Sequence, residues 1–316
     1  MESVTRRPVF RAWVIASTLA CESMVFAALP LVGGCVKGQD APLPDVTTPY
    51  EVIENARFTD PTRVDNPWLP LQPGMRYAFE GSTVEDDGTV LPHRVVINVT
   101  DMTKVVGGIR SVVTWDLDYA DGKLVEAELA FYAQDDDGNV WRMGEYPEEY
   151  VDGKFVTAPA WIHGREEALA GIMMPARPAV GTRSYAQGWG PKVDWTDRGK
   201  VDQTGVEVAV QAGRYSDVIV ITETSVSEPG AEQLKYYARG VGNVKVGWRG
   251  EGEKTKETLE LVSVDTLDAA AMAEVRAAAL KMEAHAYQVS PDAYAHTPPM
   301  ETPSGSAGND GATQTR

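Results

Sequence analysis

The chain has 316 residues and a formal net charge of −17 at pH 7, with 43% hydrophobic and 24% charged residues. These proportions are ordinary for a globular protein, so most of the chain can bury a core in one large domain or two smaller ones. A surface this negative repels phosphate backbones and anionic lipid headgroups, which argues against nucleic-acid binding and against a basic membrane-binding patch.

Residues 1–34 have the pattern of a secretory signal peptide. Three arginines near the start are followed by apolar residues, which Glu22 and Pro30 interrupt. A membrane span needs about 20 mostly apolar residues in a row, so these interruptions favour a cleaved signal. The sequence therefore predicts export, by the general route or by the twin-arginine route that the paired arginines weakly resemble.

The chain has two cysteines, Cys21 and Cys35, and both lie in its first 35 residues. Two cysteines cannot build a disulfide framework or a four-thiolate zinc site. Residues 32–35 read Val-Gly-Gly-Cys and resemble the bacterial lipobox, in which the cysteine receives a diacylglycerol. The lipobox prefers Leu and then Ser or Ala at the first two positions, and residues 18–21 match it less well. Cys35 is the predicted lipid-attachment site, with secretion after cleavage, or an uncleaved anchor, as the alternatives.

Residues 35–65 are predicted to be the lipidated N-terminus and a tether. The first part after the cysteine, residues 36–49, holds three prolines and two acidic residues without a periodic apolar pattern. Such a segment is expected to be extended and solvated. A lipid-anchored domain needs a polar leash of this kind.

Residues 66–265 are predicted to form one antiparallel β domain. Apolar and polar residues alternate here with the period of a half-buried strand, and the segments are rich in Val, Ile, Thr, Tyr and Trp. The clearest strands are residues 94–100, 111–119, 123–133, 218–226, 232–238 and 257–264.

Short turn signals separate these strands and set their connectivity. The pairs Gly107-Gly108, Asp121-Gly122 and Asp152-Gly153 accept the positive φ angles of tight hairpin turns, and Asp137-Gly138 marks a longer hairpin. Consecutive strands should therefore be antiparallel neighbours. The expected fold is all-β, with one large curved antiparallel sheet forming a half-barrel or a barrel, and a β-sandwich is the alternative.

One irregular insertion, residues 158–181, breaks the alternation and carries three prolines. A short helix is expected around residues 165–170, and the insertion should cross an open end of the sheet or cover its concave face. Its apolar side chains, which include Trp161, Met173 and Met174, need a place to be buried.

The end of the chain is predicted to be a helix followed by a disordered tail. Residues 266–288 are dense in Ala, Glu, Lys, Met and Leu, with Asp265 or Thr266 as the expected N-cap. A thin apolar stripe would dock the helix on the domain, formed by Leu267, Ala271, Val275, Ala279 and Met282. Residues 289–316 have the composition of a disordered segment.

Four segments in order resemble a family of uncharacterised bacterial secreted proteins and lipoproteins. They are "NPWLPLQPGMRYAFEG" (66–81), "YAQDDDGNVWRMGE" (132–145), "GIMMPARPAVGTRSYAQG" (171–188) and "KYYARGVGNVKV" (235–246). The resemblance implies a β-rich envelope domain and brings no established activity. Relatives tend to continue with acidic residues where Gln187 is followed here by Gly-Trp-Gly-Pro, so a site built from those acids is not expected.

Few residues suggest catalysis or metal binding. His163 lies in the irregular insertion and is interpreted as a loop histidine without a special role, because a catalytic histidine needs partners held by a rigid scaffold. Residues 135–139 read Asp-Asp-Asp-Gly-Asn, but the glycine and the twelfth residue do not fit an EF-hand loop. A hairpin turn explains them more simply, and no metal or cofactor is predicted.

The aromatic residues suggest binding. Trp115, Phe131, Tyr132 and Trp141 lie on strands predicted to pair, and Trp161, Trp189 and Trp195 lie in the irregular middle of the chain. Most should belong to the core, but in an incompletely closed barrel some could line an apolar cavity.

The favoured hypothesis is a non-enzymatic, lipid-anchored protein of the bacterial cell envelope. Its expected partners are the membrane, through the lipid, and either a hydrophobic small molecule or another envelope protein; no nucleic acid is expected. A secreted or periplasmic protein is the alternative location. The alternative function is a secreted hydrolase that uses paired carboxylates such as Glu145, Glu148 or Glu149.

Overall fold

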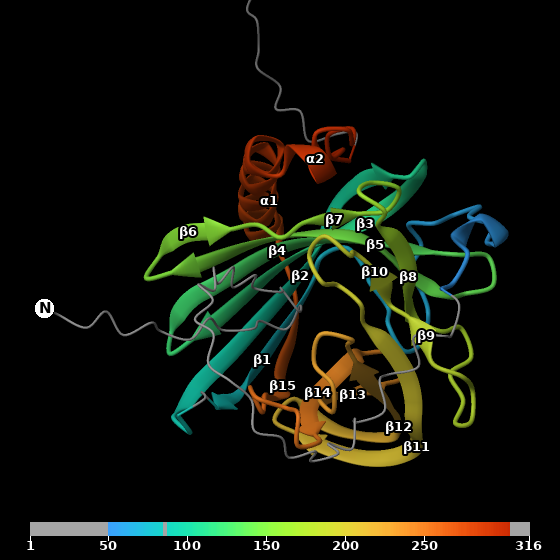
Figure 1. Ribbon diagram of the computed structural model, residues 1–316, viewed down its shortest axis with the longest axis vertical. Helices are drawn as coiled ribbons and strands as arrows, with labels where there is room; N and C mark the ends of the chain where they lie inside the picture. Colours follow the sequence, from blue (N-terminus) through green and yellow to red (C-terminus); the bar gives the residue numbers. More distant parts are fainter. Residues whose placement is uncertain (1–49, 85–86, 304–316) are drawn as a thin grey trace, which may run out of the picture.

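A computed structural model describes residues 50–84 and 87–303. The fold is a 15-stranded sheet in which every neighbouring pair is antiparallel, with the order β10-β8-β5-β4-β3-β2-β1-β15-β14-β13-β12-β11-β9, and β6 and β7 pair with β5 (Figure 1). The first eight strands are β1 (Met75–Val84), β2 (Val90–Val106), β3 (Ile109–Ala120), β4 (Lys123–Gln134), β5 (Val140–Val151), β6 (Lys154–Thr157), β7 (Trp161–Ile162) and β8 (Leu169–Met174). The others are β9 (Tyr185–Ala186), β10 (Gly188–Trp189), β11 (Arg198–Val210), β12 (Gly213–Thr224), β13 (Glu232–Ala238), β14 (Gly242–Arg249) and β15 (Thr258–Thr266).

The sheet curls around an enclosed interior, with β2–β5 on one side and β11–β14 on the other (Figure 1). No single ladder closes it. Its two ends are instead joined by residues 185–189, because β9 pairs with β11 and β10 pairs with β8. The prediction of an all-β fold with one curved antiparallel sheet is confirmed.

The predicted hairpin turns are present. Asp121 and Gly122 both have positive φ angles, 49° and 72°, and connect β3 to β4. A two-residue turn with two positive φ angles matches the twist of the flanking strands, so it fixes which residues face each other across the hairpin. This register places Asp116 opposite Glu128 and Asp118 opposite Glu126.

Two hydrophobic cores lie on opposite faces of the curved sheet. The inner face, which lines the interior, is packed with residues from both sides of the curl, such as Phe79, Val99, Ile219 and Leu261. The outer face of β2–β5 carries the second core, which includes Leu129, Phe131 and Met143. Strand alternation sends successive side chains to opposite faces, which is why β4 contributes to both cores.

Helix α1 (Ala269–Val289) lies on the outer face together with α2 (Pro291–Tyr294), as Figure 1 shows. The N-cap is Asp268, whose carboxylate accepts a hydrogen bond from the Ala271 N–H at 2.8 Å. The expected N-caps, Asp265 and Thr266, are wrong because β15 continues through Thr266. The buried stripe consists of Met272, Val275, Ala279, Met282, Glu283 and Ala286, so Met272 takes the place predicted for Ala271.

Described residues beyond the helix depart from the predicted disordered tail of 289–316. Tyr294 is fully buried against Phe131 and Tyr146, and Glu301 forms a backbone bridge with Thr103. Composition missed this because one large aromatic side chain can anchor a polar segment. The last residues, 304–316, lie outside the described part of the chain.

Two other segments also depart from the sequence expectations. Residues 50–65 of the predicted tether pack on the domain, since Ile53 in the 3-10 helix η1 (Ile53–Asn55) and Val64 are both buried. The short helix expected around residues 165–170 is a turn in which the Ala168 N–H donates to the Arg165 carbonyl at 2.7 Å. The insertion extends the sheet through β7 and β8.

Strand β11 is irregular along its length. Its pairing with β12 shifts register three times between Val201 and Val208, and β9 covers only Arg198 and Gly199 on its other side.

Among the described residues, no helix combines the length and the apolar character needed to cross a membrane.

Candidate ligand-binding site

The inner face lines a partly open cavity between the two sides of the curl. This interior cavity has a volume of about 60 Å³. Most of its lining is apolar and comes from Leu69, Pro70, Leu71, Tyr77, Phe79, Ile97, Tyr132, Met173, Tyr237, Val241 and Gly242. The polar lining residues are Thr114, Asp116, Arg142, Lys235 and Asn243. An apolar pocket with a few convergent polar groups is the usual form of a small-molecule site.

Arg142 is the central charged residue at the cavity. Strand β5 places it on the inner face, where its side chain is 4% exposed and its Nη2 atom contacts the carboxylates of Glu128 and Glu145. The guanidinium also lies 4.9 Å from the ring centroid of Trp195 and 5.5 Å from that of Tyr132. These contacts hold the guanidinium plane in one orientation.

Lys235 forms a second buried ion pair, between two neighbouring strands. Its Nζ atom lies 2.5 Å from Glu223 Oε2 on the neighbouring strand β12. Gln187, in the segment that joins the two ends of the sheet, donates to the other oxygen of Glu223 at 2.6 Å. The joining segment is therefore tied to the charged lining of the interior by a buried hydrogen bond.

Two N–H donors on the cavity wall have no hydrogen-bond partner within the described residues: Arg142 Nε and Asn243 Nδ2. Both side chains are more than nine-tenths buried. Asn243 is otherwise fixed, because its Oδ1 atom accepts from the Lys245 N–H at 2.9 Å. Buried polar atoms are nearly always paired in folded proteins, so two unpaired donors on residues that line one cavity are a specific feature, and the lining oxygens Thr114 Oγ1 and Asp116 Oδ1 are also unpaired within the described residues.

The inner face of β3–β5 also carries a row of carboxyl groups. Cross-strand register places Asp116 opposite Glu128, Asp118 opposite Glu126, and Glu126 opposite Glu149. Burial raises the pKa of Glu126 and of Asp116, and the nearby charge of Glu128 raises both further. Like charges directly opposite each other destabilise a sheet, so this arrangement needs an explanation beyond folding.

Arg142 modifies the protonation of its own partners. Burial raises the pKa of Glu128 and of Glu145, while the guanidinium acts in the opposite direction. The two carboxylates in turn raise the pKa of Arg142, against the effect of burial. The interior thus combines two basic side chains, Arg142 and Lys235, with a larger number of acidic groups.

An open groove adjoins the interior cavity. The groove has a volume of about 450 Å³ and shares three of its lining residues, Pro70, Tyr77 and Val241, with the cavity. The rest of its lining is Gln72, Met75, Ala212, Tyr215, Gly240, Val262, Ser263 and Val264. The shared residues make the groove and the cavity neighbouring compartments.

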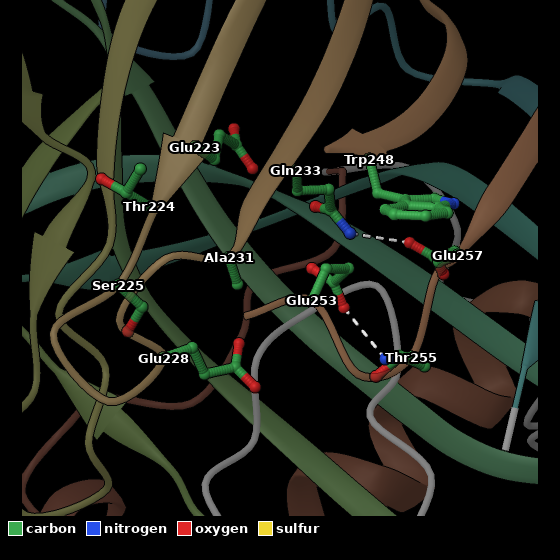
Figure 2. A pocket seen from close by; sticks show the side chains of 10 residues that line it. All are labelled: Glu223, Thr224, Ser225, Glu228, Ala231, Gln233, Trp248, Glu253, Thr255 and Glu257. Atoms are coloured by element: carbon green, nitrogen blue, oxygen red, sulfur yellow. Dashed lines mark hydrogen bonds between the residues drawn. The ribbon is translucent and has the colours of Figure 1, made fainter. Parts of the chain in front are cut away.

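A separate acidic pocket lies at the ends of β12 and β13 (Figure 2). It has a volume of about 40 Å³, and Glu223, Glu228, Glu253 and Glu257 line it together with Trp248. Burial raises the pKa of Glu253, which accepts a hydrogen bond from the Thr255 N–H at 3.0 Å. Lys256 lies 5.5 Å from the centroid of the Trp248 ring.

His93 lies behind the acidic pocket and links three elements. Its Nε2 atom is 2.7 Å from Asp118 and its Nδ1 atom is 3.1 Å from Glu257. Burial alone would lower the pKa of His93, but the hydrogen bonds to Asp118 and Glu257 outweigh it and raise the pKa to about 10. His93 is therefore a charged cross-link at neutral pH.

Among the described residues, no group of three or more His, Cys, Asp or Glu side chains is placed to hold a metal ion.

The predicted site residues are distributed over different parts of the protein. Cys35 lies outside the described residues. Glu145 and Glu149 are on the inner face, whereas Glu148 is on the outer face, where Tyr146 and His285 contact its carboxylate at 2.7 and 2.8 Å. Side-chain alternation along β5 separates these acids, so the three do not form one pair.

His163 and the Asp-rich turn have structural contacts. His163 accepts a hydrogen bond from the Ala170 N–H at 3.1 Å through Nδ1, and burial lowers its pKa. Asp135 accepts from the Asn139 N–H and from Trp141 Nε1, both at 2.8 Å. These bonds hold the irregular insertion and the β4–β5 turn in place.

The aromatic residues are divided between the two faces. Tyr132 lines the interior cavity, whereas Phe131 and Trp141 belong to the outer core. Trp161 and Trp195 stack with their centroids 5.7 Å apart beside Arg142.

Arg142, Asn243 and the facing carboxyl groups were not predicted from the sequence as site residues. A signal for the carboxyl groups was present: Asp116 and Asp118 lie two residues apart before the Asp121-Gly122 turn, and Glu126 and Glu128 lie two residues apart after it. Equal spacing about a two-residue turn predicts that they face each other. Arg142 and Asn243 gave no signal, because only the curl of the sheet brings β5 and β14 to one cavity.

Comparisons with known proteins found limited similarity. No family model matches the chain, and no curated protein matches it. One similar solved structure is a protein from Bacteroides fragilis, inferred to be exported and to have a YmcC-like fold, with 14% identity and a TM-score of 0.37. Another is a protein from Parabacteroides distasonis, inferred to be a lipoprotein, with 10% identity and a TM-score of 0.31. Each match covers 63% of this chain and 99% of the other. At these scores, neither similarity bears on the function of this chain.

Proposed function

We propose that this protein is exported to the bacterial cell envelope, is anchored there by a lipid on Cys35, and binds a small apolar molecule without transforming it. The interior cavity carries this proposal, because its largely apolar wall also holds the buried donors Arg142 and Asn243. Apolar lining supplies affinity, and a few fixed polar atoms supply orientation.

Binding is favoured over hydrolysis because of how the carboxyl groups are used. A hydrolase with paired carboxylates needs them on either side of a bound substrate. Here Glu128 and Glu145 both contact the same guanidinium, and Glu148 lies on the opposite face. Their geometry is that of groups that position Arg142.

The anchor is tested by labelling expressing cells with radioactive palmitate. The wild-type chain and the Cys21→Ala variant should incorporate label, whereas Cys35→Ala should not. Cys21→Ala is the matched control, since it removes the other cysteine of the signal region. Equal labelling of Cys35→Ala and wild type would refute attachment at Cys35.

Ligand binding is tested by native mass spectrometry of the full-length Cys35→Ala chain purified gently from its host. A bound small molecule should appear as an added mass that is lost in Val241→Trp, which fills the boundary between cavity and groove. An unchanged adduct in that variant, or bare protein throughout, would refute ligand binding at this site and favour a scaffold that docks another envelope protein.

A further inference from the structure

The inference concerns the chemistry of the ligand's polar head, and it rests on the proposed function. The interior cavity is small: a single water needs about 10–15 Å³ of such space, so about 60 Å³ holds a head group of a few atoms. The adjoining groove, at about 450 Å³, has room for a chain. The two compartments therefore fit one molecule with a compact head and an apolar tail.

The unpaired polar atoms of the cavity lining indicate which hydrogen-bonding groups the polar head of the ligand carries. Arg142 Nε and Asn243 Nδ2 are N–H donors, each on a side chain that is more than nine-tenths buried, and the lining oxygens Thr114 Oγ1 and Asp116 Oδ1 also have no hydrogen-bond partner within the described residues. A buried donor without a partner costs about 1–3 kcal/mol, which a ligand oxygen can recover. The head should therefore carry a hydrogen-bond acceptor. An ammonium head has donors only and cannot pair with Arg142 Nε or Asn243 Nδ2, whereas an amide or hydroxyl head offers an acceptor to these two atoms and a donor to Asp116 Oδ1.

The charged residues around the cavity indicate whether the polar head of the ligand is charged. Arg142 is already paired with Glu128 and Glu145, and Lys235 is paired with Glu223. Asp116 adds a further acidic group to the cavity lining. A carboxylate or phosphate head would therefore find both cationic side chains of the cavity lining, Arg142 and Lys235, already paired with carboxyl groups, in an interior where charges are weakly screened.

We infer that the cavity and groove bind a single-chain amphiphile with an uncharged head that bears a carbonyl or hydroxyl oxygen, which accepts hydrogen bonds from Arg142 Nε and Asn243 Nδ2. The tail lies in the groove along Met75, Tyr215 and Val262. Pro70, Tyr77 and Val241, which line both compartments, surround the junction of head and tail.

The test compares three probes with the same chain and different heads: octanamide, octanoate and octylammonium. Dissociation constants are measured by titration calorimetry at pH 7 on the full-length Cys35→Ala chain, which carries no N-terminal lipid that could compete for the groove. Octanamide should bind about tenfold more tightly than either charged probe, since tenfold corresponds to about 1.4 kcal/mol. This ranking needs no variant of the cavity and is unaffected by folding defects.

The variant Asn243→Asp tests the hydrogen bond from Asn243 Nδ2 to the ligand. It keeps the Oδ1 atom that accepts from the Lys245 N–H and replaces the N–H donor group with a second carboxyl oxygen. Octanamide binding should weaken about tenfold, whereas Asn55→Asp, the same change at an exposed residue, should leave it unchanged. Far-UV circular dichroism checks that both variants are folded.

The failures of the two proposals differ. Octanoate or octylammonium binding as tightly as octanamide, or octanamide binding that is insensitive to Asn243→Asp, would overturn the uncharged head and leave the ligand site standing. Absence of measurable binding for all three probes would overturn both the head-group assignment and the ligand site.

Discussion

Single residues in this protein are constrained mainly by close approach and by buried charge. Gly171 on β8 is the clearest steric case. A Cβ atom there would lie 2.1 Å from the Gly188 nitrogen and 2.5 Å from the Ala186 carbonyl oxygen. These are backbone atoms of the segment that joins the two ends of the sheet, so they cannot move aside without breaking the β8–β10 pairing.

The variant Gly171→Ala should therefore be destabilised by about 1–3 kcal/mol or more, as expected for overpacking against rigid neighbours. Gly213→Ala is the matched control, because a Cβ atom there would lie 3.5 Å from the Tyr215 hydroxyl oxygen, an ordinary van der Waals contact. Urea unfolding followed by tryptophan fluorescence measures both. A stability for Gly171→Ala equal to that of Gly213→Ala would contradict the close approach.

The single residue His93 makes the free energy of unfolding depend on pH. Its pKa is about 10 in the folded protein and about 6.5 in an unfolded chain, so the folded state holds the proton more tightly. The contribution of His93 to the free energy of unfolding is fully present below pH 6.5. It is lost as the pH rises towards 10, at up to about 1.4 kcal/mol per pH unit.

The variant His93→Gln should lose this component. Its free energy of unfolding should decline less than that of the wild type between pH 7 and pH 10, with the two proteins measured in the same buffers. His296→Gln controls for the substitution at an exposed histidine. Parallel pH profiles for wild type and His93→Gln would show that the cross-link to Asp118 and Glu257 is not charged.

At the scale of elements, helix α1 and the following segment are held to the sheet by a buried ion pair. Lys104 on β2 is fully buried and donates to Glu283 of α1 and to the Pro298 carbonyl, both at 2.8 Å. Its Nζ atom also lies 4.3 Å from the centroid of the Tyr294 ring. One lysine thus links the sheet, the helix and the C-terminal segment.

Replacing Lys104 with Met should cost about 3–5 kcal/mol, because it leaves the Glu283 carboxylate buried without its cation. Lys281→Met, on an exposed position of the same helix, should change stability by less than about 0.5 kcal/mol. Denaturant unfolding compares the two. Similar midpoints would mean that water or other groups replace the lysine.

How far the sequence predicts the fold differs from element to element. The strands and two-residue turns were predictable because alternation and turn residues act over a few positions. The packing of residues 290–303 was not, since it depends on Tyr294 meeting Phe131 and Tyr146 from distant strands. The cavity was anticipated only as an apolar space; the donors Arg142 and Asn243 meet there through long-range curvature that no local pattern encodes.

At the scale of the whole molecule, the row of buried carboxyl groups makes the fold sensitive to pH. Burial raises the pKa of Asp116, Glu126, Glu128 and Glu145 in the folded state. A group with a raised pKa stabilises the fold below its unfolded pKa, and this contribution is lost as the pH rises. These four groups together should make the protein more stable near pH 5 than near pH 8.

Glu126→Gln isolates this effect. The variant should be more stable than wild type at pH 8, where the charge of Glu126 opposes those of Glu128 and Asp118, and similar to wild type near pH 4. Glu274→Gln, on an exposed helical position, serves as the control. Thermal unfolding across this pH range measures both, and a loss of stability at pH 8 in Glu126→Gln would contradict the prediction.

The irregular strand β11 has a consequence for how copies of this protein meet. Beyond Gly199 its outer edge has no strand partner among the described residues, and such an edge can recruit a strand from another molecule. Its three register shifts bend the edge, and Lys200, Asp202 and Glu207 place charges along it. Bulges and charges both hinder strand addition. The irregularity of β11 therefore protects the protein against edge-to-edge aggregation.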